Sequence, residues 1–416
     1  MTSIMKKIIF TLCLILSITV QTKAQRNEIY SDNIKSLQVV SNDDWLSPPI
    51  MVLGGANTMN IDFDDLSHTY HRYTYTVEHC EADWTPSTEI FESDYMEGFN
   101  GNPIEDFEKS INTTVLYTHY SLTIPNKNCR LKMSGNYKLT VYDDDNNSEK
   151  VLTAYFMVVQ PVMGVSMNIS TNTDIDVNES HQQVGMELSY GSLNVTDPAG
   201  QIKTVVMQNG RWDNAVFDVK PNYIMNNKLI WTHNRSLIFD AGNEYHKFEM
   251  LDVHHPTLGV DHIDFIADYY HCTLFANEPR RNYIYDPDAN GSFYIRNSDN
   301  VDNNTYSDYL WVHYTMRCDR LNGNVYVNGT WTNDTFLPEY LMTYNEINKC
   351  YEATILQKQG YYSYQYLVQN DNGTSSFLPE EGNFYQTENK YQALVYFKGS
   401  GERTYRLLGY GNVTFK

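Results

Sequence analysis

The stretch His79-Cys-Glu-Ala-Asp-Trp84 carries an imidazole and two carboxylates at alternate positions. On a β-strand, His79, Glu81 and Asp83 would share one face, an arrangement suited to metal binding or acid–base work. No HExxH motif or similar partner spacing accompanies them. The favoured interpretation is therefore a strand end with a packed Trp84, and a metal or catalytic site is the alternative.

A second cluster, Asp286-Pro-Asp288-Ala-Asn290-Gly291, resembles the start of a calcium loop. Oxygen ligands stand at positions one, three and five, and glycine stands at position six. Position twelve is Asn297, which cannot supply the bidentate carboxylate of such loops. Turns rich in Asp and Asn are common in hairpins, so we expect a turn here and keep a calcium site as the alternative.

The third cluster is a scatter of His and Asp over residues 252–272: His254, His255, Asp261, His262 and His271. Their spacing matches no metal-ligand set, and ordinary surface or core histidines explain it better. The chain also lacks a G-x-S-x-G motif and a phosphate-binding loop. We therefore assign no catalytic, cofactor-binding or metal-binding residue and predict that the protein is not an enzyme.

β-Strands must position these clusters, because apolar residues recur with period two over most of the chain. Met59, Ile61 and Phe63 alternate with polar neighbours, as do Tyr137, Leu139 and Val141. Such alternation places one face of a strand in a core and the other in water, as in an antiparallel sandwich. The polar interval 81–109 is predicted to be a long loop, with one helical turn at most.

The strands group into three predicted domains, residues 25–160, 161–297 and 306–416. Pro161 follows the first group, and the polar linker Asn297–Ser307 separates the second from the third. No long amphipathic helix stands out. The predicted fold class is all-β, with tandem immunoglobulin-like β-sandwich domains.

The octet Gln208–Ala215, with the sequence QNGRWDNA, follows one of these strands. Asn209-Gly210 is a strong signal for a tight turn, because such a turn needs positive φ at both positions. Trp212 comes directly afterwards. We expect it to pack at the junction of the first two domains and to fix the angle between them.

The first 24 residues are predicted to be a secretory signal peptide. Lys6 and Lys7 precede the apolar run Ile8–Val20, and Ala24 is a small residue at the predicted cleavage position. The run is short for a membrane span, and no Cys follows the cleavage position to carry a lipid. The formal net charge is −21, which disfavours binding to nucleic acid or to an anionic membrane. We expect a soluble exported protein that does not insert into a membrane.

Five cysteines follow the predicted leader: Cys80, Cys129, Cys272, Cys318 and Cys350. They are widely spaced and form no CxxC motif, so neither a zinc site nor a redox motif is indicated. An odd number excludes complete pairing within one chain. Cys318 with Cys350 is the first pair to test, since both lie in the last predicted domain.

The last domain resembles the early-set immunoglobulin-like modules of the glycogen- and starch-binding class. The resemblance rests on Gly323–Trp331, Tyr351–Ile355 and Gly360–Tyr366. An exposed Trp331 would stack on a sugar ring. This makes a secreted or periplasmic carbohydrate-binding protein the main alternative function, and a β-rich hydrolase with dispersed catalytic groups a weaker one. If the domain is only a reused scaffold, Trp331 simply packs.

Several stretches together resemble the plug protein family of the type IX secretion system. They run in order over nearly the whole predicted mature chain: 28–38, 79–87, 93–99, 117–126, 134–141, 209–215 and 288–296. The resemblance implies a periplasmic protein that seals the periplasmic mouth of the outer-membrane translocon barrel when no cargo occupies it. That barrel is the implied partner. The family brings no enzymatic activity, metal or cofactor, and no contact residue is transferred to this chain.

Overall fold

The computed structural model describes residues 26–191, 193–299 and 301–416. The predicted signal peptide, residues 1–24, lies outside the described residues. The described chain forms antiparallel sheets joined by short turns and single-turn helices, which confirms the predicted all-β class of tandem sandwiches. No helix in this part of the chain has the length and apolarity needed to cross a membrane.

The first unit, residues 26–160, is a sandwich of two sheets around one apolar core. One sheet has the order β1 (Glu28–Ile29), β12 (Glu149–Val159), β11 (Gly135–Asp143), β5 (Tyr73–Cys80) and β7 (Asn102–Pro103), with β3 (Ile50–Val52) parallel to β12. The other has the order β2 (Ile34–Ser41), β4 (Met59–Asp65), β9 (Thr118–Ile124) and β8 (Asp106–Lys109). Met59, Ile61 and Phe63 are buried, as their alternation predicts. The polar interval after residue 81 holds the predicted helical turn, α2 (Glu92–Tyr95), and the short ladder of β6 (Met96–Gly98) with β10 (Cys129–Leu131).

The second unit joins residues 162–240 to the C-terminal residues 387–416. Its first sheet has the order β13 (Gly164–Ser170), β14 (His181–Ser189), β18 (Lys228–Trp231) and β17 (Tyr223–Met225), with β19 (Ile238–Asp240) on β14. Its second sheet has the order β16 (Val216–Phe217), β15 (Ile202–Gln208), β30 (Asn389–Phe397) and β31 (Arg406–Phe415). The helical turn α3 (Pro198–Gln201) precedes β15.

The third unit, residues 241–386, pairs two further sheets around a Tyr-rich core. One centres on β28 (Gly360–Gln369), which pairs with β20 (His246–Met250), β23 (Phe293–Ile295), β25 (Asn324–Asn328) and β29 (Ser375–Phe377). The other has the order β21 (Val260–Ile266), β22 (Tyr269–Leu274), β24 (Tyr309–Arg317), β27 (Cys350–Lys358) and β26 (Thr343–Asn345). The helical turn α4 (Asn303–Tyr306) falls in the predicted linker.

Strand pairing therefore cuts across the segments predicted as the second and third domains. Strands β20, β22 and β23, from the segment 161–297, pair with strands of the last segment. Conversely, every residue of β15, in the segment 161–297, pairs with a residue of β30 in the last segment. The alternation of apolar residues locates strands but does not identify the distant strand with which each one pairs. The third unit is thus inserted between the two parts of the second.

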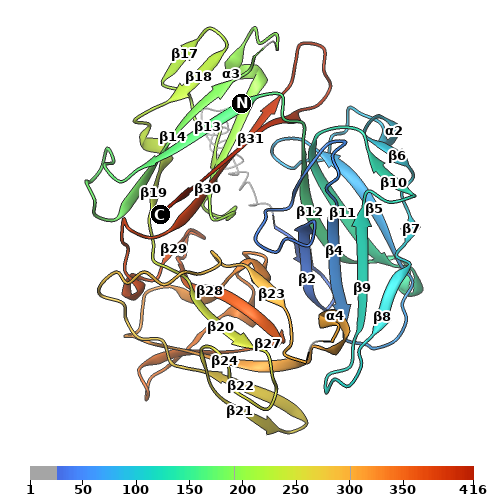
Figure 1. Ribbon diagram of the computed structural model, residues 1–416, viewed down its shortest axis with the longest axis vertical. Helices are drawn as coiled ribbons and strands as arrows, with labels where there is room; N and C mark the ends of the chain where they lie inside the picture. Colours follow the sequence, from blue (N-terminus) through green and yellow to red (C-terminus); the bar gives the residue numbers. More distant parts are fainter. Residues whose placement is uncertain (1–25, 192, 300) are drawn as a thin grey trace, which may run out of the picture.

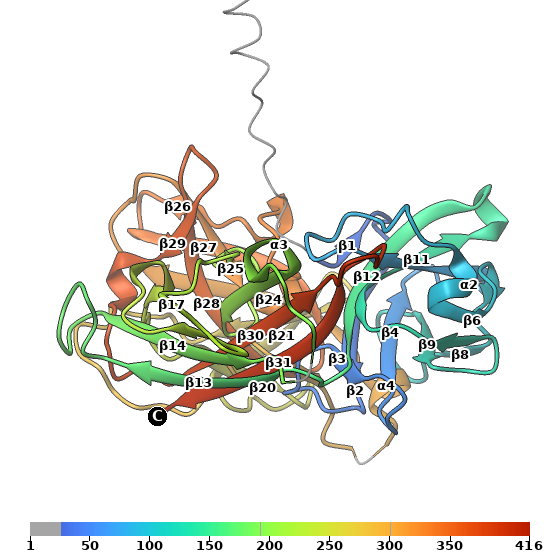
Figure 2. The same ribbon diagram turned by 90° about the horizontal axis from the view of Figure 1, so that it is seen from above.

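The three units surround a common centre, and the molecule is broader than it is thick (Figures 1 and 2). The first unit contacts both others. Residues of β5, β12, β15 and β30 share one apolar cluster at the junction of the first and second units.

Candidate functional site at the junctions between the units

The stretch 79–84 is a strand end followed by a tight turn. Strand β5 ends at Cys80, and Trp84, with φ of +66°, donates its backbone N–H to the Glu81 carbonyl at 2.9 Å. His79, Glu81 and Asp83 therefore do not share a strand face, because the strand stops before Glu81. The alternative of a metal or catalytic site depended on that shared face and therefore has no geometric support. The favoured interpretation, a strand end with a packed Trp84, is confirmed.

His79 and Asp83 of this stretch both have structural partners. His79 is buried, donates from Nε2 to the Ser134 carbonyl at 3.2 Å and accepts at Nδ1 from Ser87 Oγ at 2.9 Å. Burial lowers the pKa of His79, which favours the neutral ring. Asp83 accepts hydrogen bonds from the backbone and hydroxyl of Thr85 at 3.1 and 2.6 Å.

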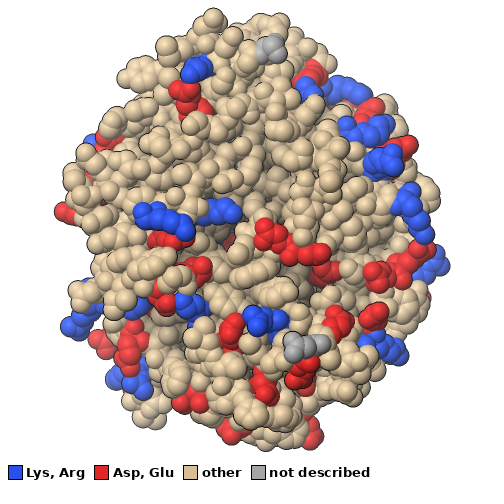
Figure 3. Space-filling model, viewed as in Figure 1, with Lys and Arg blue, Asp and Glu red and all other residues tan. Residues whose placement is uncertain are grey.

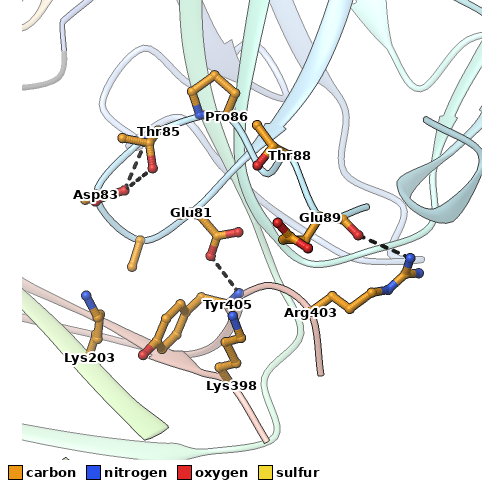
Figure 4. Close-up of a pocket in the computed structure, with 11 residues that line it drawn as sticks. Glu81, Asp83, Thr85, Pro86, Thr88, Glu89, Lys203, Lys398, Arg403 and Tyr405 are labelled. Carbon is orange, nitrogen blue, oxygen red and sulfur yellow. Dashed lines mark hydrogen bonds between the residues drawn. The ribbon is translucent and has the colours of Figure 1, made fainter. Parts of the chain in front are cut away.

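A charged pocket of about 320 Å³ opens between this turn and the second unit (Figure 4). The Glu81 carboxylate accepts the backbone N–H of Tyr405 at 3.0 Å, and Arg403 donates to the Glu89 carbonyl at 3.2 Å. Lys203 and Lys398 lie 5.2 and 5.7 Å from the centre of the Tyr405 ring. These contacts hold the loop before β31 against the first unit, so the pocket is part of a junction between units.

The octet 208–215 lies at the same junction. Asn209 and Gly210 have φ of 54° and 70°, which confirms the predicted turn. The Trp212 ring meets the Trp84 ring edge-on, with centroids 5.5 Å apart. Trp212 also packs on the cluster shared by the first two units, so its predicted place at their junction is confirmed.

Arg211 and Asp213 of the octet form a buried ion pair that reaches the third unit. Arg211 donates from Nε and Nη2 to the two Asp213 oxygens at 3.0 and 2.7 Å. Asp213 also accepts from Ser375 Oγ at 2.6 Å, on β29. Burial alone would raise the pKa of Asp213, but the Arg211 guanidinium outweighs it and holds that pKa low. The sequence offered no sign of this bidentate pair, because its two residues read as parts of a polar turn.

A second buried ion pair joins the first and third units. Asp64 on β4 and Lys358 on β27 are each 1% exposed, with Nζ and Oδ2 2.6 Å apart. Asp64 also accepts from the Tyr309 hydroxyl at 2.6 Å and contacts His119 Nδ1 at 2.7 Å. Burial opposes ionisation of Asp64, but the nearby Lys358 ammonium outweighs it and lowers the pKa of the carboxyl. Ionised groups buried this deeply are tolerated when their partners are in place.

A protein-family model described as the type 9 secretion system plug protein first domain matches residues 34–160. The match covers the first unit from β2 to the end of β12.

The chain belongs to the type IX secretion system plug protein family.

One solved structure resembles this plug-family protein over nearly its whole length. The crystal structure of a hypothetical protein from Parabacteroides merdae is 42% identical, with a TM-score of 0.90, and the match covers 94% of this chain and 99% of that one. The N-terminal region of an enterococcal surface protein matches at 8% identity, with a TM-score of 0.19 and coverage of 96% and 97%. A TM-score this low does not indicate a shared fold. No curated protein matches the chain.

The segment 286–291 of the plug-family protein is an Asp-stabilised turn, as expected. Asp288 accepts the backbone N–H groups of Tyr245 and Asn290. Asp286 instead pairs with Lys247, and the Asn297 backbone N–H bonds to Asn303. The Asp286 and Asp288 carboxylates are thus used within the fold, whereas Asn290 Oδ1 has no partner among the described residues. Among the described residues, one group brings three metal-ligand atoms within 4.8 Å of one another, and it consists of His71, Asp143 and Asp145.

The predicted histidine cluster is divided among local contacts. His255 pairs with Asp252 at 2.7 Å, and His262 lies between Asp261 and Asp264 at 3.0 and 3.5 Å. His271 Nδ1 lies 2.9 Å from Nε2 of His313, a residue that the sequence analysis did not select. The parallel pairing of β22 with β24 brings these two rings together, and sequence spacing cannot show such pairing.

Trp331, the residue predicted to stack on a sugar, packs among tyrosines. Its ring lies 5.8 Å from the centres of both Tyr340 and Tyr362, edge-on to each, and Nε1 donates to the Ser363 carbonyl at 3.3 Å. These contacts favour the reused-scaffold interpretation of the third unit.

The five cysteines, Cys80, Cys129, Cys272, Cys318 and Cys350, are free and buried. The suggested Cys318–Cys350 bond is absent from the described structure. The register of β24 and β27 pairs Cys350 with Arg317, so Cys318 lies one residue further along, beyond the end of β24. Burial raises the pKa of the Cys318 thiol to about 12, which keeps it protonated.

Stability near Asp288 should decrease with rising pH. Burial raises the pKa of Asp288 to about 7. Its contribution is therefore complete below the ordinary pKa of about 3.9 and is lost as the pH rises through 7. We expect the melting temperature of Asp288→Asn, expressed relative to that of the wild type, to rise from pH 5 to pH 8. Calorimetry at pH 5 and pH 8 measures the difference in melting temperature between the variant and the wild type. The cost of the lost hydrogen-bond acceptor is the same at both pH values and cancels in this comparison. A difference that does not change with pH would contradict the prediction.

Proposed function

We propose that this plug-family protein is a non-enzymatic periplasmic stopper. It is exported by a cleaved signal peptide, then binds and seals the periplasmic opening of the outer-membrane type IX translocon barrel when no cargo is present. The match of the first unit to the plug family carries this proposal. It associates with the outer membrane through that partner and requires no cofactor.

The joined units suit such a role. A stopper must keep its shape while one face binds a rim, and the buried Asp64–Lys358 and Arg211–Asp213 pairs join separate units. The molecule is broader than it is thick (Figures 1 and 2), which suits a capping mode of binding. A stopper must also dissociate when cargo arrives, which favours a broad interface of moderate apolarity over a deep pocket.

The second unit offers the surface that fits a rim contact best. Figure 3 shows few charged side chains over the upper left part of the face drawn, where Figure 1 places β13, β14, β17 and β18. On β17, three consecutive apolar side chains, Tyr223, Ile224 and Met225, are exposed. Grouped exposed apolar residues mark interaction surfaces more often than scattered ones.

Co-purification tests the stopper. The tagged protein, extracted gently from its native cells, should bring an outer-membrane barrel with it, and deletion of its gene should make the outer membrane leak large hydrophilic solutes. Recovery as a free monomer, together with an intact permeability barrier in the deletion strain, would contradict the proposal.

Ile224→Asp should weaken barrel binding by roughly tenfold or more, because it places a charge in an apolar contact. Ile224 is 62% exposed, so the fold should tolerate the change. Ile347→Asp in the third unit is the matched control, since Ile347 is 90% exposed and lies far along the chain. Equal barrel recovery with both variants would remove β17 from the interface.

A further inference from the structure

A cleft of about 370 Å³ lies where the three units meet. The first unit lines it with β2 and the Trp45 loop, the second with the octet and β30, and the third with the 288–293 turn. Its volume falls within the range of ligand pockets. The proposed stopper role assigns no task to this cleft.

An edge strand faces the cleft. Strand β2 ends its sheet and pairs with β4 on one side. Four consecutive residues of β2, Leu37 to Val40, line the cleft. Side chains alternate between the two faces of a strand, so four successive residues line one cavity only when the backbone edge faces it.

The hydrogen-bond register identifies the backbone groups on that edge. Asn42 donates its N–H to the Thr58 carbonyl of the neighbouring strand at 3.1 Å. Backbone N–H and C=O groups of successive strand residues face opposite edges of the strand. Counting back from Asn42, those of Val40 therefore also face β4, whereas both the N–H and the C=O of Val39 face away from it. An unpaired edge of this kind is a template for another strand.

Polar side-chain atoms without partners line the same cleft. Trp84 Nε1, Arg26 Nε and Asn290 Oδ1 are buried and have no hydrogen-bond partner among the described residues. Trp84 is only 8% exposed. A buried donor or acceptor without a partner costs stability, so two N–H donors and one amide oxygen at one cleft indicate an occupant that both accepts and donates.

The walls between these polar atoms are aromatic. Trp45, Tyr155, Trp212 and Phe293 line the cleft beside Trp84. Aromatic walls bind large apolar side chains, and the Trp84 indole would donate to a peptide carbonyl alongside them.

We propose that the cleft binds a short extended peptide segment of a partner protein, which pairs as an added strand with β2. The backbone of the segment bonds to Val39, and an aromatic or large aliphatic side chain of the segment packs against Trp84 and Trp212. Strand addition of this kind combines main-chain affinity with side-chain pockets for specificity. The proposal is independent of the stopper role, because purified protein alone suffices to test it.

Selection from a phage-displayed heptapeptide library on the purified full chain provides the probe. The best peptides, made synthetically, should quench the fluorescence of the cleft tryptophans. Val39→Pro removes the outward N–H and leaves the bonds to β4 in place, so it should weaken binding about tenfold for the lost hydrogen bond. Val39→Ala, which keeps the N–H, is the control and should bind nearly as the wild type does.

Single N-methylation along the peptide tests strand pairing without changing the protein. Methylation should weaken binding at every second amide, because alternate N–H groups of a strand face its neighbour. A flat methylation profile, or equal binding to Val39→Pro and Val39→Ala, would overturn the proposal. So would a library without enriched peptides, or a cleft that binds chitotriose and no peptide.

Discussion

Replacing Lys358 by Met should lower the free energy of unfolding by about 3–5 kcal/mol, the usual cost of removing one partner of a buried ion pair. The Asp64 carboxylate would stay buried without its nearest cation. Lys358 also donates to the Asn304 carbonyl at 2.7 Å and lies 4.1 Å from the centre of the Tyr117 ring, so the loss extends beyond one contact. Chemical denaturation monitored by tryptophan fluorescence measures the change.

Lys35→Met is the matched control for that experiment. Lys35 and Glu339 also join the first and third units, at 3.2 Å, but both side chains are partly exposed. Surface pairs contribute about 0–1 kcal/mol, so this variant should unfold almost like the wild type. The double variant Asp64→Leu with Lys358→Met should recover much of the loss, because no buried charge is left unpaired. Equal losses of unfolding free energy in Lys358→Met and Lys35→Met would contradict the larger contribution expected from the buried pair.

Trp212→Ala should cost about 3 kcal/mol, at the lower end of the range for large aromatic residues in cores, because Trp212 is half-buried. The change removes the edge-on contact with Trp84 and opens a space between the first and second units. We expect a clear decrease in melting temperature by calorimetry.

Phe91→Ala is the control for Trp212→Ala, since Phe91 is 73% exposed and should change stability by no more than about 0.5 kcal/mol. An unchanged melting temperature in Trp212→Ala together with lost barrel binding would place the octet in the interface and not in the junction. Loss of both properties would support a junction that holds the binding surface in place.

Local patterns predicted the strands and the turns well. The alternation at 59–63 identified the buried face of β4, and Asn209-Gly210 fixed a turn because few other residue pairs adopt positive φ at both positions. The favoured strand end near His79 is confirmed, and the alternative of a strand that continues to Asp83 is not, since alternating polar residues also occur where a strand ends in a turn.

Apart from the place of Trp212, the contacts at the junctions could not be predicted from the sequence. Asp64 and Lys358 lie 294 residues apart, and nothing local distinguishes them from surface charges. Asp64 occupies a polar position in an alternating strand, which normally faces water, but a neighbouring unit covers that face. The cleft beside Val39 has the same origin, because its walls come from three separate units.

The nested arrangement of the second and third units has a consequence for how the protein is made. Strand β15 has no full-length neighbour until β30, which follows the third unit in the chain, is available. The third unit, by contrast, is one continuous segment. The second unit can therefore close only after the whole third unit has been synthesised. Premature termination near residue 386 would leave a complete third unit beside an open, aggregation-prone sheet of the second unit.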